Sequence, residues 1–209
     1  MSHDYYCWLF PDRKLRKSEA YVAWTEIMRE FKGTPARIMS GGPDYTSTDL
    51  EATEHGDEVG PNDDTEMLTY RLRGQEVDFW LHSLFPDGTV KIAVLSVAEY
   101  SLSAQRMDFA EELLEIIDRM HARFASKRTM LGWELGELGD FDPHRELAAL
   151  SDGRLDGLYW LDIAASRLVD EERLGTLESY AERAQDCILT RLPNGDFKFR
   201  HSFFNLAGF

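Results

Sequence analysis

Of the side chains in this sequence that could bind an ion or take part in acid–base chemistry, carboxylates are the most densely clustered. Residues 38–70 contain nine acidic side chains and no lysine or arginine. The densest part is 51–67, EATEHGDEVGPNDDTEM, which places Asp57, Glu58, Asp63, Asp64 and Glu66 close together. A divalent-cation site, a solvated loop, or a surface for a basic partner could each be built from such a segment.

Ligand spacing argues against a dedicated metal site. The calcium-loop pattern DxDxDG is absent from residues 57–66, and the six histidines form no HExxH or HxH pair. His121 follows the apolar stripe of a predicted helix, which favours a hydrogen-bonded histidine at the core boundary over a metal ligand. We therefore expect no metal and no cofactor.

Motifs for covalent or nucleotide chemistry are also missing. The sequence contains no GxSxG, GxGxxG or GxxxxGK[ST] pattern. Cys7 and Cys187 belong to no CxxC pair and lie in predicted strands, so we expect two free, buried thiols in a reducing compartment. No catalytic residue is predicted, and the protein is expected not to be an enzyme.

Net charge limits the classes of partner. The chain has 38 acidic and 23 basic residues, a formal net charge of −15. Such a chain is repelled by nucleic acid and anionic lipid, whereas a basic protein is attracted to it. The N-terminal residues show no signal-peptide pattern, and no apolar run approaches the roughly 18 residues that span a bilayer. We expect a cytoplasmic protein with no nucleic-acid or membrane partner.

The hydrophobic pattern predicts an α+β fold with a mainly antiparallel sheet and amphipathic helices packed on it. A length of 209 residues suits one domain, 1–209, with residues 40–66 as an acidic loop. Tight turns at FPDG and PNG join neighbouring strands, which favours antiparallel pairing. All five tryptophans are expected in the core. Strands are predicted at 5–10, 67–73, 77–84, 89–98, 130–137 and 156–165, a hairpin at 186–202, and helices at 18–31, 101–127, 143–150 and 170–183.

Two stretches carry a resemblance to a known family. One is YYCWLF followed by SEAYVAWTEIMREF, and the other is LYWLDIAASRLVDEERLGTLESYAERAQDCILTRLPNGDFKFR (158–200). With the acidic balance of the chain, they resemble the immunity proteins of bacterial polymorphic toxin systems, in particular the family numbered fifty-two. The resemblance covers the chain in the order of its elements, and it matches no catalytic residue.

That resemblance implies a cytoplasmic antidote that binds and blocks a cognate toxin. Such toxins are delivered by contact-dependent routes such as type VI secretion, and the implied partner is a restriction-endonuclease-like nuclease. A nuclease must attract phosphate, so its cleft is commonly basic and an acidic surface can compete for it.

We therefore predict that Asp57, Glu58, Asp63, Asp64 and Glu66 contact the toxin. A solvated loop is the alternative interpretation of that segment. A carboxylate-rich enzyme that uses a divalent cation, and a secretion-system adaptor or chaperone, remain the other functional hypotheses.

Overall fold

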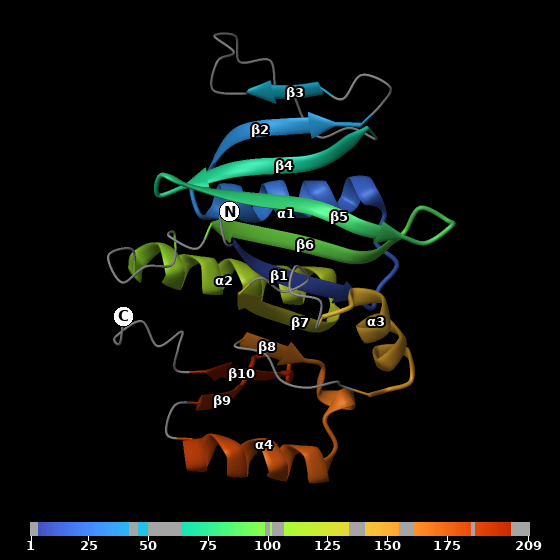
Figure 1. Ribbon diagram of the computed structural model, residues 1–209, viewed down its shortest axis with the longest axis vertical. Coiled ribbons are helices and arrows are strands. Elements are labelled where there is room, and N and C mark those ends of the chain that lie inside the picture. The colour runs from blue at the N-terminus through green and yellow to red at the C-terminus, as the bar shows by residue number, and fades with distance from the viewer. Residues whose placement is uncertain are drawn as a thin grey trace.

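The described chain forms one ten-stranded sheet. The computed structural model describes residues 4–41, 46–49, 64–98, 101, 107–133, 141–154, 161–184 and 187–201. The strand order is β3-β2-β4-β5-β6-β1-β7-β8-β10-β9, so the sheet runs from β3 at one end to β9 at the other (Figure 1). The paired strands are antiparallel. The predicted α+β fold class is confirmed.

The elements follow one another along the chain with short connections between several of the strands. They are β1 (Asp4–Pro11), α1 (Lys17–Glu30), β2 (Thr34–Ser40), β3 (Thr46–Asp49), β4 (Thr65–Leu72), β5 (Gln75–Leu84), β6 (Val90–Ala98), α2 (Met107–Phe124), β7 (Ser126–Trp133), α3 (Pro143–Ser151), β8 (Leu161–Ala164), a 3-10 turn (Ser166–Leu168), α4 (Glu171–Ala184), β9 (Cys187–Arg191) and β10 (Phe197–His201).

Strands β2 and β3 are absent from the sequence-based prediction. Proline is disfavoured inside a sheet, but β2 accommodates Pro35 where its register with β4 shifts. β3 pairs with β2 and lies inside the predicted acidic loop at 40–66. Residues 42–45 and 50–63 of that segment lie outside the described part of the chain.

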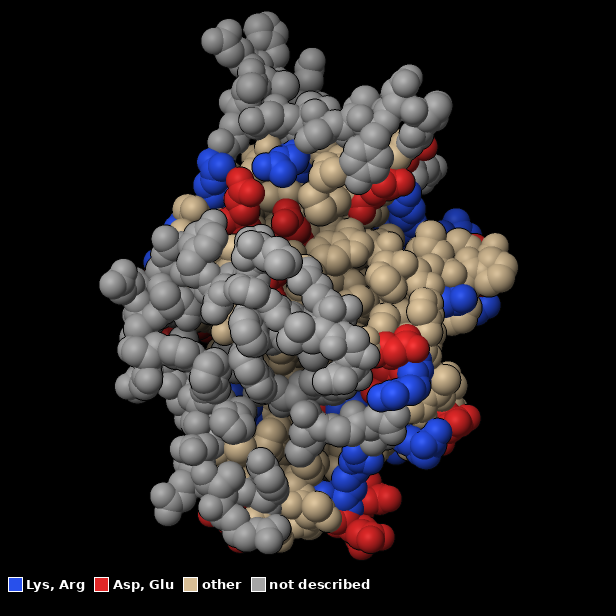
Figure 2. Space-filling view, viewed as in Figure 1, with Lys and Arg blue, Asp and Glu red and all other residues tan. Residues whose placement is uncertain are grey.

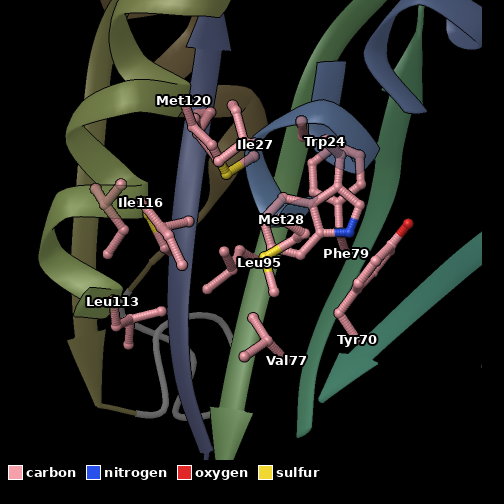
Figure 3. Close-up of a cluster of buried hydrophobic side chains, with 14 of the residues drawn as sticks. Trp24, Ile27, Met28, Tyr70, Val77, Phe79, Leu95, Leu113, Ile116 and Met120 are labelled. Carbon is pink, nitrogen blue, oxygen red and sulfur yellow. The ribbon is translucent and has the colours of Figure 1, made fainter. Parts of the chain in front are cut away.

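Helices α1 and α2 cover one face of the sheet, and the larger hydrophobic core lies beneath them (Figure 3). Trp24 of α1 stacks on Phe79 of β5 with ring centroids 5.2 Å apart, and Phe124 of α2 meets the same ring edge-on at 6.0 Å. Full burial of each large apolar side chain contributes about 1.5–3 kcal/mol. This packing fixes the position of β5 in the sheet.

The opposite face carries a second, smaller core. Trp8 of β1 and Val94 of β6 pack there with Leu150 of α3 and Leu177 of α4. Figure 1 shows α3 in front of the sheet in this view. Because β1 and β6 are buried on both faces, their sequences are apolar at nearly every position rather than alternating.

A buried charge cluster attaches α3 to this face. Arg128 of β7 has no exposed side-chain surface. Its Nε donates to Asp162 Oδ1 at 2.9 Å, its Nη2 donates to Asp162 Oδ2, and its Nη1 donates to Glu146 Oε1 at 2.5 Å. Burial opposes the charged form of Arg128, but Asp162 and Glu146 outweigh that effect and raise its pKa. The cluster joins β7, β8 and α3.

His121 of α2 is fully buried, so its predicted place at the core boundary is wrong, whereas its predicted hydrogen bonding is confirmed. Nδ1 lies 2.8 Å from Thr129 Oγ1, and Nε2 lies 3.1 Å from Asp196 Oδ2. Burial lowers the pKa of His121, although Asp196 opposes the shift. Since Asp196 belongs to the turn between β9 and β10, this contact fastens the last hairpin to α2.

Both cysteines are free and buried, as predicted. Burial raises the pKa of the Cys7 thiol, and the charge of Asp118 adds to the shift. Thiolate is the reactive form of cysteine, so Cys7 is a core residue without nucleophilic character.

Candidate functional site

Strands β4 and β5 separate at Trp80, and a pocket lies where they part. Met67 pairs with Trp80, but Thr65 pairs with Ser40 of β2 instead of continuing along β5. β5 meanwhile continues beside β6 as far as Leu84, through two register shifts. The pocket has a volume of about 460 Å³ and is lined by Lys17, Tyr21, Thr65, Glu66, Met67, Trp80, Leu81 and Leu84.

Tyr21 connects α1 to the start of β4. Its hydroxyl donates to the backbone oxygen of Glu66 at 2.7 Å, and its ring meets Phe79 edge-on at 5.7 Å. Burial raises the pKa of Tyr21, which keeps the phenol a neutral donor. Nearby, the Gly41 N–H donates to the backbone oxygen of Asp64 at 2.9 Å. These bonds hold the first residues of β4 in place.

Two of the five predicted partner-binding carboxylates lie at this place. Asp64 directly precedes β4 and Glu66 is the second residue of β4. Both are exposed. Glu66 lines the pocket. Asp57, Glu58 and Asp63 lie outside the described residues. Of the five carboxylates, the structure therefore places Asp64 and Glu66 where β4 and β5 separate.

Trp80 departs from the prediction that all tryptophans lie in the core. Trp8 and Trp24 are buried, but Trp80 is only partly buried and lines the pocket. Its ring meets Tyr6 of β1 edge-on, with centroids 6.2 Å apart. Alternation along β5 was the signal for this: Val77 and Phe79 face the larger core, so Trp80 faces the other side of the sheet.

Exposed apolar side chains continue from Trp80 to the tip of the β5–β6 hairpin. Leu84 is 38% exposed and Phe85 is 44% exposed. In Figure 2 the area from above β5 to the hairpin is tan, the colour of all residues other than Lys, Arg, Asp and Glu, and acidic side chains in red lie close to it. We call Asp64, Glu66, Trp80, Leu84 and Phe85 the fork surface. An apolar, aromatic centre with charged neighbours is typical of protein–protein interfaces.

Groups suited to other chemistry are few. Within the described ranges, no group of three or more His, Cys, Asp or Glu side chains is placed to hold a metal ion. His82 of β5 lies beside His144 of α3, with ring centroids 5.7 Å apart. Partial burial lowers the pKa of His82, and the neighbouring His144 lowers it further.

Comparison with known proteins gives a weak similarity to a solved structure. No protein-family model and no curated protein matches the sequence. Among solved structures, the Pseudomonas aeruginosa T6SS protein PA0821 is similar with a TM-score of 0.47 and 13% identity. The match covers 95% of this chain but 64% of that protein. A similarity at this level assigns no function to the chain.

None of the helices that the structure describes is both long and apolar enough to cross a bilayer.

Proposed function

We propose that the protein is an immunity protein that binds a cognate bacterial toxin through the fork surface and blocks its activity. The observation that carries the proposal is the position of Asp64 and Glu66 beside a pocket that exposes Trp80. The sequence resemblance to the immunity protein fifty-two family supports the same function and names a restriction-endonuclease-like nuclease as the toxin class.

The two kinds of residue in the fork surface have separate roles in binding. A half-buried tryptophan next to exposed Leu84 and Phe85 offers the kind of anchor that supplies most of the binding energy in an interface. Carboxylates at its edge contribute less to affinity, but they accelerate association with a basic partner and select against acidic ones. A basic nuclease cleft is complementary to both features.

Survival and inhibition test the proposal. A candidate toxin domain, sought first in the gene immediately upstream, is expressed in a bacterial host with and without this protein, and the purified pair is assayed for nuclease activity. We expect restored growth and loss of nuclease activity at equimolar ratio. A toxin domain that neither binds the protein nor loses activity would refute the proposal. Co-purification with a structural secretion component, without inhibition of a toxin, would favour the adaptor hypothesis instead.

A pair of substitutions tests whether the fork surface is the contact. Trp80→Ala removes the anchor, and we expect the dissociation rate constant of the toxin complex to rise at least about tenfold. Ile188→Ala is the matched control, because Ile188 is 40% exposed but belongs to β9 at the opposite end of the sheet. Both rates are measured by biolayer interferometry. Equal dissociation rate constants for the two variants would show that the toxin does not contact the fork surface.

A further inference from the structure

Two histidines from different elements face each other on the same side of the sheet as α3. His82 comes from β5 and His144 from the first turn of α3, and both side chains are exposed. Their ring centroids lie 5.7 Å apart with planes inclined by 43°. This pair cannot be predicted from residue spacing, because the two histidines are far apart in the chain and only the fold brings them together.

The distance between the two ring centres is close to the distance expected for two imidazoles that bind the same metal ion. Zinc binds imidazole nitrogen at about 2.0–2.1 Å and prefers tetrahedral angles. With about 1.2 Å from nitrogen to ring centre, two imidazoles on one such ion have ring centres about 5.2 Å apart. The observed centroid distance of 5.7 Å is within about 0.5 Å of that value. The rings thus need little movement to bind one ion between them.

Aromatic packing positions His82, and the N-cap of α3 fixes the backbone of His144. Trp8 meets the His82 ring edge-on at 5.0 Å, and the same Trp8 packs against Phe141 at 5.2 Å. Phe141 stands just ahead of α3, whose N-cap Asp142 accepts a hydrogen bond from the His144 backbone N–H at 2.9 Å. Glu146 of the same helix is held by the buried Arg128. Such supporting contacts reduce the ordering cost of ligand binding.

We propose that His82 and His144 form a binding site for a divalent transition-metal ion, with zinc as the representative ion and water in the remaining positions. Imidazole is a preferred ligand of zinc, copper and nickel. The net charge of −15 favours cations near the protein. The positive end of α3 opposes a cation, and the carboxylate of Asp142 at the same helix end offsets that effect. The ion joins β5 to α3.

Isothermal titration of the metal-free full chain with zinc chloride tests the site, together with the melting temperature in zinc. We expect saturable binding of one ion and a rise in melting temperature. His82→Phe keeps an aromatic ring against Trp8 but removes the nitrogens, and His144→Ala removes the other ligand. Each should weaken zinc binding at least about tenfold, since even loss of an outer-shell partner costs 10–100-fold. His3→Ala, which removes a different histidine, should leave the affinity unchanged.

The outcome is decided by the pattern across these variants. Loss of zinc binding in both His82→Phe and His144→Ala, with His3→Ala unaffected and circular dichroism unchanged, supports the site. Zinc binding that both variants retain at wild-type affinity, or no zinc binding by the wild-type chain, overturns it. His144→Gln is a second variant at the exposed helix position, in case His144→Ala disturbs α3. The test needs no toxin, so its result is independent of the proposed immunity function.

Discussion

Arg128 carries its charge at a position with no exposed side-chain surface, between the carboxylates of Asp162 and Glu146. Arg128→Met would leave two buried carboxylates without their cation, so we expect it to lower the free energy of unfolding by about 3–5 kcal/mol. Arg154→Met is the control, because Arg154 pairs with Asp152 at the surface and its loss should cost no more than about 0.5 kcal/mol. Urea denaturation at neutral pH measures both. Equal costs would show that the buried cluster adds no stability.

His121 links stability to pH. In the unfolded chain its imidazole titrates near the ordinary value of 6.5, whereas in the folded protein burial lowers the pKa. Between these two values the unfolded state binds more protons, so the free energy of unfolding falls as the pH drops through and below 6.5. Urea denaturation from about pH 7 to about pH 5 should show a shallower fall in His121→Gln than in the wild type. Parallel curves would exclude His121 as the titrating group.

Single-residue roles were only partly predictable from sequence. Asp64 and Glu66 are predicted to bind a partner because local charge density is visible in one stretch of sequence, and this role stays a prediction. Arg128, Asp162 and Glu146 were missed because their contacts join three elements that only the fold brings together. Trp80 was placed in the core by residue type, although its alternation with Phe79 already indicated the other face.

At the scale of elements, the β4–β5 connection depends on left-handed backbone. Arg73 has φ +48° and Gly74 has φ +78°, as expected for the two central residues of a primed hairpin turn. Gly74→Ala places a Cβ where no atom lies within 4 Å, so any cost comes from the backbone alone. We expect a loss of about 1 kcal/mol in the free energy of unfolding.

Gly175 provides the matched control for this substitution. It lies inside α4, its φ is not positive, and a Cβ there also meets no atom within 4 Å. Gly175→Ala should therefore raise the free energy of unfolding by about 1 kcal/mol, because alanine favours helix over glycine. Thermal and urea denaturation of the two variants measure the difference. Shifts of the same sign in both would mean that backbone conformation does not decide the outcome.

The elements that sequence predicted are those with strong periodicity or strong turns. The apolar stripe of α2 and the Asn194-Gly195 turn are examples, and both correspond to elements of the structure. β3 reads TSTD and has no apolar side chain, so no hydrophobic pattern marks it. Its strand conformation comes with pairing to β2 at the end of the sheet, a tertiary contact that leaves no mark in the hydrophobic pattern.

At the scale of the whole molecule, the net charge of −15 attracts any basic partner, so the position of the charges must be separated from their number. Replacing Asp57, Glu58, Asp63, Asp64 and Glu66 by their amides removes five negative charges from one segment. If this segment guides a basic toxin to the fork surface, we expect the association rate constant at low salt to fall at least about tenfold. The dissociation rate constant should change less, because rim charges act mainly on association.

The control for this variant has the same net charge with the charges removed elsewhere. Glu30, Glu111, Glu115, Glu178 and Glu182 are exposed residues of α1, α2 and α4, and all five become glutamine. Association rates are measured by stopped flow at about 50 mM and about 200 mM salt, because screening removes the electrostatic contribution. A slower rate at low salt in the first variant alone locates the guiding charge in the acidic segment. Equal slowing in both variants would assign it to the overall charge of the molecule, because a field summed over the whole surface does not depend on which carboxylates are removed.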